Sequence, residues 1–307
     1  MTISFIIPCK NEDRYIAKSI ESILNEMEGR EYEIIVCDNG STDSTLEILA
    51  SFGDSIKVVN SDMNTVAGVR NHGVRVSKGS ILVFVDADTS IELGWHKKLM
   101  LLLNNIAIDD WFSGSHVLEP IESNCFPRGW YDDAISYMDS THMNTAHMIV
   151  PRKTFNLIGG FNIDLVSGED YDISKRLKDR GCELISDGRL RAYHYGFPTS
   201  IWEFVSRESW HGIGDYTSLS AILDSKVAIL SLVFLFSHFL LLLGLFLDFR
   251  LTVAAFALII GVCLISSFAK YRKQKIVKII KYAMYFYLYF IGRSASPFLK
   301  VYRLGSR

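Results

Sequence analysis

Short apolar runs alternate with amphipathic stretches over the first two thirds of the chain. Runs with strand character lie at residues 3–7, 32–37, 56–59 and 81–85. Between them, helical spacing of apolar side chains or helix-capping residues mark residues 11–27, 41–51 and 66–77. A repeated strand–helix order is typical of a mostly parallel, doubly wound sheet. The sequence therefore predicts an α/β fold for this region.

The pattern changes after about residue 225. Residues 227–247 and 251–269 are apolar runs, each long enough to cross the roughly 30 Å hydrocarbon core of a bilayer as a helix. Because only three residues separate them, we expect a tight transmembrane hairpin rather than two buried core helices. The basic residues 270–275 favour the cytoplasmic side. A hairpin returns the chain to the side that it left, so we expect a multi-pass membrane protein whose N-terminal region is also cytoplasmic.

Residues 276–291 have a mixed character. They contain Lys278, Lys281 and several tyrosines, so they form either a short third span or, as we prefer, a helix in the headgroup region. We therefore predict three parts. These are a catalytic domain at 1–215, an amphipathic linker with two transmembrane helices at 216–269, and a basic loop, third helix and tail at 270–307.

Composition and missing motifs exclude several classes of protein. The formal net charge of -2 gives no overall basic character that would indicate nucleic-acid binding. Five scattered cysteines show no metal-ligand spacing, and we expect them to be reduced packing residues. The chain has no glycine-rich dinucleotide fingerprint after the first strand, no P-loop and no Gly-x-Ser-x-Gly elbow. These absences argue against a dinucleotide dehydrogenase, a P-loop nucleotidase and a serine hydrolase.

Polar residues follow three of the predicted strands at the point where each strand ends. The stretch 8–12 follows the first strand, Asp38 follows the second, and Asp86 and Asp88 follow the strand at 81–85. Ligands of doubly wound sheets bind outside the carboxyl ends of the strands. Carboxylate oxygens suit Mg²⁺ or Mn²⁺, which bind together with substrate phosphates. The sequence therefore predicts a metal and phosphate site here, although Asp-x-Asp alone could also be a solvated turn.

Six stretches occur in an order that resembles the inverting family 2 glycosyltransferases, which have the GT-A fold. They are residues 5–12 (FIIPCKNE), 35–43 (IVCDNGSTD), 68–73 (GVRNHG), 84–88 (FVDAD), 159–161 (GGF) and 168–170 (GED). The resemblance covers residues 1 to about 215. It implies a GT-A-type fold and transfer of a sugar from a nucleotide diphosphate donor, with inversion at the anomeric carbon and help from a divalent metal.

The resemblance also implies roles for residues on the donor side of the site. Pro8 and Glu12 frame the nucleotide, Asp38 binds the base (typically uracil), Arg70 lies near the diphosphate, Asp86 binds ribose or orients the site, and Asp88 ligates the metal. Two alternatives stay open, because Arg70 could be a solvated helix residue and Asp38 a helix cap or turn residue.

An acidic pair, Glu169 and Asp170, matches the acceptor side of the family's site. We expect Asp170 to act as the general base, with Glu169 as its alternative or as an acceptor-binding partner. The pair could instead only charge the first turn of a helix at 171–180. Because some GT-A enzymes use a late histidine as a further metal ligand, His194 is either such a ligand or a structural histidine.

Departures from the family pattern narrow the predicted reaction. The Gln-x-x-Arg-Trp motif of processive members is reduced to Trp210 within residues 206–210, so we expect addition of one sugar to a lipid-linked or cell-envelope glycan acceptor. The donor expected is a UDP-sugar. The stretch 89–92 departs from the Gln-Asp-Pro pattern of polyprenyl-phosphate glycosyltransferases, which weakens that alternative. A catalytically silent membrane scaffold and a nucleotidyltransferase are further alternatives. Donor sugar, acceptor, linkage, Mg²⁺ or Mn²⁺, and oligomeric state are not encoded in any of these motifs.

Overall fold

The structure, a computed structural model, divides into two compact units. It describes residues 2–305 except 107–109, 115–116, 121–123, 125, 128, 131–141 and 273. The first unit comprises Met1–Ser123 and Ile135–Gly196, and the second comprises Asn124–Ala134 and Phe197–Arg307. Each unit is described below by itself.

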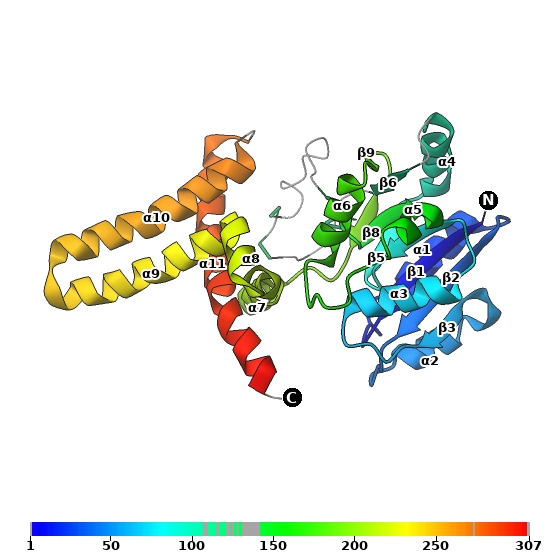
Figure 1. The fold of residues 1–307 in the computed structure, drawn as a ribbon, viewed down its shortest axis with the longest axis horizontal. Helices are drawn as coiled ribbons and strands as arrows, with labels where there is room; N and C mark the ends of the chain where they lie inside the picture. Colours follow the sequence, from blue (N-terminus) through cyan, green and yellow to red (C-terminus); the bar gives the residue numbers. More distant parts are fainter. Residues whose placement is uncertain are drawn as a thin grey trace. The chain divides into compact units, whose positions relative to one another are not determined.

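The first unit is built on a mixed sheet with the strand order β3-β2-β1-β4-β8-β6-β9 among the described residues (Figure 1). One half is parallel and contains β3 (Lys57–Asn60), β2 (Tyr32–Asp38), β1 (Ile3–Cys9) and β4 (Ile81–Val85). The other half contains β8 (His147–Pro151), antiparallel to its neighbours β4 and β6 (Trp111–Gly114), and β9 (Glu183–Ser186), parallel to β6. A smaller sheet has the order β5 (Thr89–Ile91), β10 (Ala192–His194) and β7 (Val117–Leu118).

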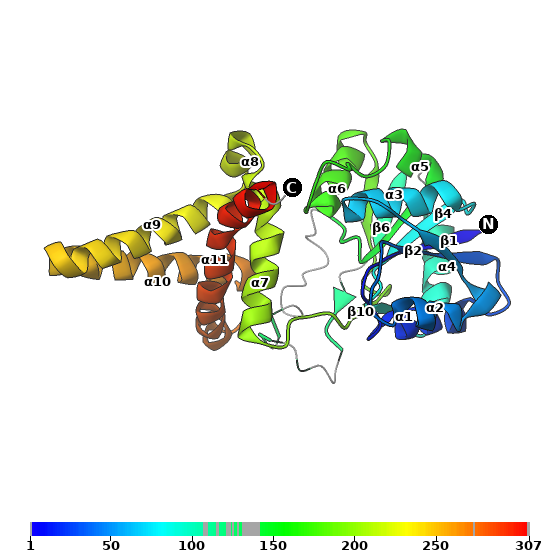
Figure 2. The same cartoon turned by 90° about the horizontal axis from the view of Figure 1, so that it is seen from below.

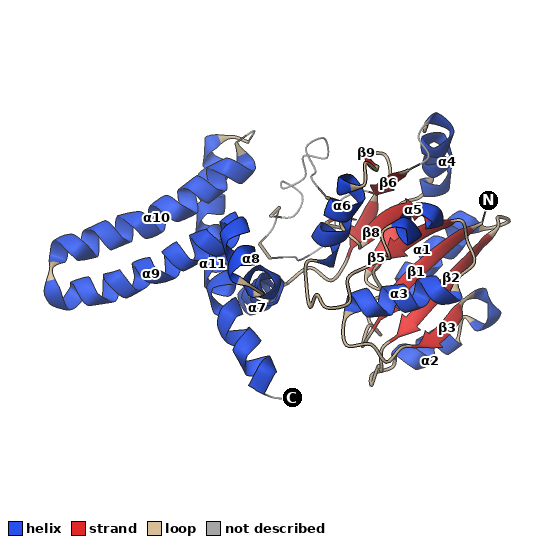
Figure 3. Ribbon diagram, in the orientation of Figure 1, coloured by secondary structure: helices blue, strands red, loops and turns tan. Residues whose placement is uncertain are grey.

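Helices cover both faces of the large sheet because its central strands β1 and β4 are buried on both sides (Figure 3). Phe5 and Ile34 pack in one cluster, with α1 (Ile16–Met27) and α4 (Trp95–Asn105). Their neighbours Ile6 and Ile35 pack in the other, with α3 (Val66–Val76), α5 (Arg152–Leu157) and α6 (Glu169–Asp179). The period-two alternation of a strand thus divides the core into two layers. The remaining short elements are α2 (Thr45–Ala50) and η1 (Gly53–Ser55).

Close packing of α3 on the sheet depends on Gly73. A Cβ atom at this position would lie 2.5 Å from Ile6 Cγ2 and 2.9 Å from Cys37 Sγ. Only a residue without a side chain lets the helix approach β1 and β2 this closely. The approach fixes α3 against the strand ends and so fixes the position of the polar residues that it carries.

The second unit is helical. Its elements are α7 (Ile201–His211), η4 (Gly212–Tyr216), α8 (Leu219–Asp224), α9 (Lys226–Leu247), α10 (Phe249–Tyr271) and α11 (Ile276–Gly305). Ser225 caps α9 by accepting a hydrogen bond from the backbone N–H of Ala228, and Asp248 caps α10 through the N–H of Arg250. Figure 2 shows α9 and α10 as an antiparallel pair.

Helices α9 and α10 are long and apolar enough to span a membrane. Each contains an 18-residue window with a mean hydropathy of 2.5, and only 22% and 28% of these windows are buried in the described structure. Core helices of a soluble protein would be mostly buried. The structure thus has the α/β sheet and the following hairpin of apolar helices that the sequence predicts.

The boundary between the units differs from the predicted domain boundary at residue 215. Helix α7 and η4 belong to the helical unit, because α7 packs along α11. Ser296 Oγ donates to the Ser209 carbonyl (2.8 Å), and Arg293 pairs with Glu208 (3.1 Å) and Asp215 (3.3 Å). Contacts between distant segments such as these have no signature in local hydrophobic periodicity.

Candidate active site

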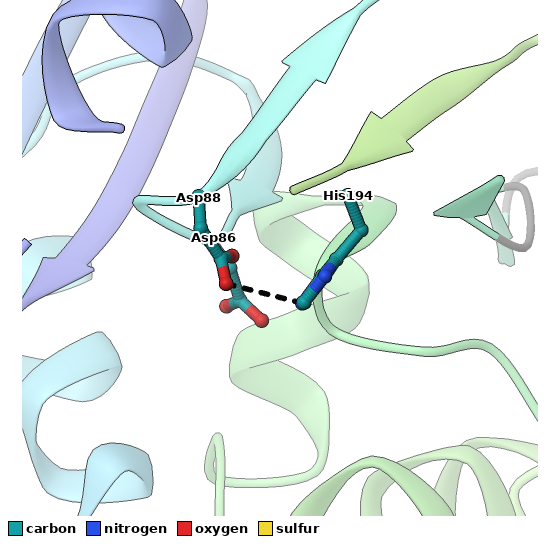
Figure 4. Close-up of side chains that lie close together, drawn as sticks. All are labelled: Asp86, Asp88 and His194. Carbon is teal, nitrogen blue, oxygen red and sulfur yellow. Dashed lines mark ion pairs between the residues drawn. The ribbon is translucent and has the colours of Figure 1, made fainter. Parts of the chain in front are cut away.

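Pairing of two short strands brings Asp88 and His194 together. Asp88 directly precedes β5, and His194 ends β10, where it pairs in antiparallel register with Thr89. The backbone N–H of Tyr195 donates to the Asp88 carbonyl (2.8 Å). As a result, His194 Nε2 lies 3.3 Å from Asp88 Oδ2, and the two side chains point toward each other (Figure 4).

Asp86 completes a group with metal-ligand spacing. One ligand atom from each of Asp86, Asp88 and His194 lies within 4.8 Å of the others. Two carboxylate oxygens and one imidazole nitrogen are a donor set that Mn²⁺ accepts, and Mg²⁺ also uses carboxylates. Gly196 leaves the space for this group, because a Cβ atom there would lie 1.8 Å from Asp88 Oδ2. The residues present therefore fit a divalent metal ion.

Arg70 is buried on the inner face of α3 and joins two acidic residues. Its side chain is 3% exposed. Arg70 Nη2 lies 2.6 Å from Asp86 Oδ1, and Arg70 Nη1 lies 2.8 Å from Glu169 Oε1. Thr145 Oγ1 donates to the same Glu169 oxygen (3.4 Å). Its burial and these contacts exclude the alternative that Arg70 is a solvated residue on the helix surface. The guanidinium holds Asp86 in place and offsets the charge of the two carboxylates.

Glu169 and Asp170 begin α6 but have different surroundings. Glu169 is buried and bound by Arg70, whereas Asp170 is partly exposed and accepts a hydrogen bond from the backbone N–H of Tyr171 (2.7 Å). Although Asp170 keeps some exposed surface, the protein atoms packed around its carboxyl group, followed by the charge of Glu169, raise the pKa of Asp170. A carboxylate with a raised pKa is the stronger proton acceptor. Asp170 is thus the carboxylate of the pair that Arg70 does not bind, and its role as the base stays a prediction, while the pair also charges the first turn of the helix.

The loop after β1 places Glu12 near the two aspartates. Burial, then repulsion from Asp88 and Asp86, raises the pKa of the Glu12 carboxyl to about 7. The preceding Asn11 has a φ of 56° and ties this loop to the loop after β2. Its Oδ1 accepts from the N–H of Thr42 (2.7 Å). Pro8 lies within β1, opposite Cys37. Its contact with a nucleotide stays a prediction.

Asp38 lies at the end of β2 with its carboxylate turned into its own loop. The side chain is buried and accepts from the N–H groups of Gly40 and Ser41, both at 3.1 Å, and from the hydroxyl of Ser41. Asp38 therefore stabilises the turn that follows β2, which is one of the alternatives that the sequence left open. Recognition of a base by the remaining lone pairs of Asp38 stays a prediction.

Two supporting residues escaped the motif analysis. Gly196 makes room for Asp88, and Tyr195 holds the end of β10. The Tyr195 ring stacks on Tyr15 at 5.9 Å, and Lys18 Nζ lies 3.9 Å from its centroid. Both residues directly follow His194, and that proximity is the one signal in the sequence that could have indicated them.

Known proteins share sequence with this chain. The family described as Glycosyl transferase family 2 matches residues 4–115. The Escherichia coli protein named UDP-Glc:alpha-D-GlcNAc-diphosphoundecaprenol beta-1,3-glucosyltransferase WfgD is 32% identical over 229 residues, which are 70% of this chain and 86% of that protein. Glycosyltransferase AglE of Haloferax volcanii is 30% identical over 199 residues, 59% of this chain and 63% of AglE. The matched part of the chain covers a smaller share, 15% and 23%, of the length of two Bacillus relatives.

Solved structures share the fold. The mannosyltransferase PcManGT of Pyrobaculum calidifontis, in complex with GDP-Man and Mn²⁺, has a TM-score of 0.62 at 16% identity, covering 97% of this chain and 87% of its own. GalNAc-T7 with UDP, GalNAc and Mn²⁺ has a TM-score of 0.51 at 19% identity, covering 63% and 43%. Since sequence, fold and an Asp-x-Asp group at the end of β4 agree, this chain belongs to family 2 of the glycosyltransferases.

Proposed function

We propose that this protein is a membrane-anchored, inverting glycosyltransferase that adds one sugar to a lipid-linked or cell-envelope glycan. The donor is a nucleotide diphosphate sugar, most simply a UDP-sugar. The observation that carries the proposal is the grouping of Asp86, Asp88 and His194 at the carboxyl end of β4. The printed name of the relative WfgD, which includes both UDP-Glc and a diphosphoundecaprenol acceptor, supports the choice of donor and acceptor class.

The donor side needs residues that hold a metal and orient the diphosphate. Asp86, Asp88 and His194 would hold Mn²⁺ or Mg²⁺. When bound, such an ion neutralises the leaving diphosphate as a Lewis acid. Arg70 keeps Asp86 in one position through a buried ion pair. Preorganised charges of this kind stabilise a transition state without reorganisation during the reaction.

The acceptor side needs a base. We assign this role to Asp170, whose pKa is raised by burial and by Glu169. The acceptor hydroxyl oxygen forms a bond to the anomeric carbon while its proton passes to Asp170. At the same time the bond from the anomeric carbon to the diphosphate oxygen breaks, and its electron pair leaves with the nucleoside diphosphate. Attack opposite the leaving group inverts the anomeric centre.

The helical unit supplies the membrane anchor. In this proposal α9 and α10 cross the bilayer as a hairpin, which their length, apolar character and exposure support. The basic residues 270–275 follow the second helix and favour the cytoplasmic side. The catalytic unit precedes the first helix and lies on that same side, where nucleotide sugars are supplied.

A donor panel tests the proposal. Detergent-solubilised full-length protein is incubated with individual nucleotide sugars, Mn²⁺ or Mg²⁺ and a membrane lipid extract, and released nucleoside diphosphate is measured. We expect metal-dependent turnover of one donor, lost in Asp88→Ala and strongly reduced in Asp170→Asn. Asp54→Ala and Asp179→Asn, at exposed positions of the same unit, serve as matched controls that keep full turnover.

Each result discriminates among the alternatives. Turnover that survives Asp170→Asn would indicate an acceptor that is already ionised, such as a polyprenyl phosphate, and would remove Asp170 as the base. If no nucleotide or metal ion binds to the folded protein in a direct titration, the enzymatic proposal is wrong and a silent scaffold remains.

A further inference from the structure

Helix α11 carries an exposed apolar stripe. Val277, Ile280, Met284, Tyr287 and Ile291, spaced alternately three and four residues apart, form this outer stripe. Val277 and Met284 are 74% and 73% exposed, and the other three are 39% to 56% exposed. Spacing of three and four residues places side chains on one face of a helix. An apolar face this long is rarely left in water.

The opposite face of α11 is already used for packing. Ile279, Tyr282, Phe286 and Phe290 are buried in the core of the helical unit. The outer stripe is therefore a second apolar surface of the same helix. Apart from Tyr287, which contacts α9, packing among the described residues of this unit does not account for it. The stripe needs an occupant from outside the described structure.

The stripe borders the hairpin of α9 and α10. Tyr287 Oη lies 3.2 Å from His238 Nε2 of α9, and its ring lies 5.4 Å from the ring of Phe234. Figures 1 and 2 both show α11 crosswise to the hairpin, at the end away from the α9–α10 turn. If the hairpin stands upright in a bilayer, a crosswise helix at its base lies along the surface, and a stripe next to the hairpin faces the lipid.

Charge favours a lipid surface over a second copy of this helix. The chain contains no acidic residue after Asp248, whereas Lys275, Lys278 and Lys281 are exposed at the start of α11. A second copy of α11 would therefore bring no opposite charge to these lysines. Anionic headgroups attract basic side chains beside an apolar surface, and this attraction decays within a Debye length.

We propose that α11 is an in-plane membrane helix whose outer stripe enters the boundary between headgroups and acyl chains of an anionic bilayer. Lys278 and Lys281 then bind lipid phosphates. This inference rests on the membrane-spanning hairpin of the proposed function, and it assigns α11 as the part of the protein that holds the base of the hairpin at the surface. Amphipathic helices of this kind bury their apolar face about 5–10 Å deep.

Depth-dependent fluorescence quenching tests the inference in the full-length protein. A fluorescent amino acid replaces Val277, Met284 or Ile291 one at a time, and the protein is reconstituted in phosphatidylglycerol-containing vesicles. The lipids carry a nitroxide either near the glycerol or near the end of the acyl chain. We expect stronger quenching by the shallow nitroxide at all three positions, with depths that agree within a few ångströms.

Controls separate this inference from the proposed hairpin. Phe239 of α9 is 60% exposed and should be quenched by lipid, whereas Leu93 of the catalytic unit is 86% exposed and should not be. A depth difference of about 21 Å between positions 277 and 291, from a rise of 1.5 Å per residue, would show that α11 spans the bilayer and would overturn the proposal. Quenching at Phe239 without quenching on the stripe would assign the stripe to water or protein. No quenching at Phe239 would overturn both the hairpin and the inference.

A charge reversal tests the lipid headgroups. Lys278→Glu combined with Lys281→Glu should reduce quenching at Met284 at least twofold in anionic vesicles, while quenching at Phe239 is retained. Lys97→Glu combined with Lys153→Glu, at exposed positions of the catalytic unit, is the matched control and should change nothing. Unchanged quenching at Met284 after the reversal at 278 and 281 would exclude a role for anionic headgroups.

Discussion

One added methyl group at Gly196 probes the metal site without removing any ligand. Gly196 does not have a positive φ, so its backbone accepts alanine. Its Cβ atom, however, would lie 1.8 Å from Asp88 Oδ2, 2.9 Å from Asp88 Cγ and 3.1 Å from His194 Cε1. The Asp88 carboxylate must therefore move away from the position in which it faces His194.

The size of this movement sets the expected loss of affinity. Restoring even a tight contact of 3.0 Å from the present 1.8 Å requires a shift of about 1.2 Å. Ligand distances in metal sites hold to within about 0.2 Å, so Asp88 can no longer ligate with its original geometry. Disturbing the groups that orient ligands costs about 10- to 100-fold in metal affinity, which corresponds to about 1.4–2.7 kcal/mol. We expect at least this loss for Gly196→Ala.

Titration with Mn²⁺ measures the effect directly. The electron paramagnetic resonance signal of unbound Mn²⁺ gives the Kd for the full-length protein in detergent. Gly188→Ala is the matched control, because a Cβ atom there meets nothing within 4 Å. The metal-free Tm should change little in either variant, since only one partly exposed side chain has to move. An unaltered Kd in Gly196→Ala would refute Asp88 as a ligand.

Three further predictions concern other parts of the catalytic unit. Arg70→Met breaks a buried ion-pair group and should lower the free energy of unfolding by about 3–5 kcal/mol, measured by thermal denaturation in detergent. Arg75→Met, on the exposed side of α3, is the control and should have almost no effect. Equal destabilisation by the two substitutions would contradict the argument. Because the pKa of Asp170 is raised, the folded protein binds more protons than the unfolded chain between the ordinary and the raised pKa. The free energy of unfolding should therefore fall as pH rises through this interval, whereas activity should rise as the base loses its proton. A pH–rate profile with the pKa of an ordinary aspartate would contradict this prediction. Asn11→Ala should lower the free energy of unfolding by about 1–2 kcal/mol, because residue 11 has a left-handed backbone that alanine disfavours. Loss of the hydrogen bond to Thr42 adds to this effect. Asn11→Gly should cost less than Asn11→Ala, and the reverse order in unfolding measurements would refute the strain argument.

Local patterns predicted much of the catalytic unit. The strand expected at 81–85 is β4 (Ile81–Val85), and the helix expected at 66–77 is α3 (Val66–Val76). These predictions succeed because the period of apolar side chains reports which face of an element is buried. The same reasoning holds for the two long apolar runs, which became α9 and α10.

Long-range pairing decided the chemistry of the site. The ion pair between Arg70 and Glu169 joins residues 99 positions apart. The contact of His194 with Asp88 depends on the register of β10 against β5. A single sequence contains no period that records such pairings, so only the placed strands show that His194 lies beside Asp88. Its role as a metal ligand stays a prediction.

The sequence by itself determined which segments become strands, helices and apolar hairpin, and that Asp86 and Asp88 stand at the end of a buried strand. Only the tertiary structure decided that Arg70 binds Glu169, and that Gly196 makes space for Asp88. The physical reason is that burial periodicity is a property of neighbouring residues. Site geometry, in contrast, depends on how closely separate elements approach, and hence on side-chain volumes summed over the whole core.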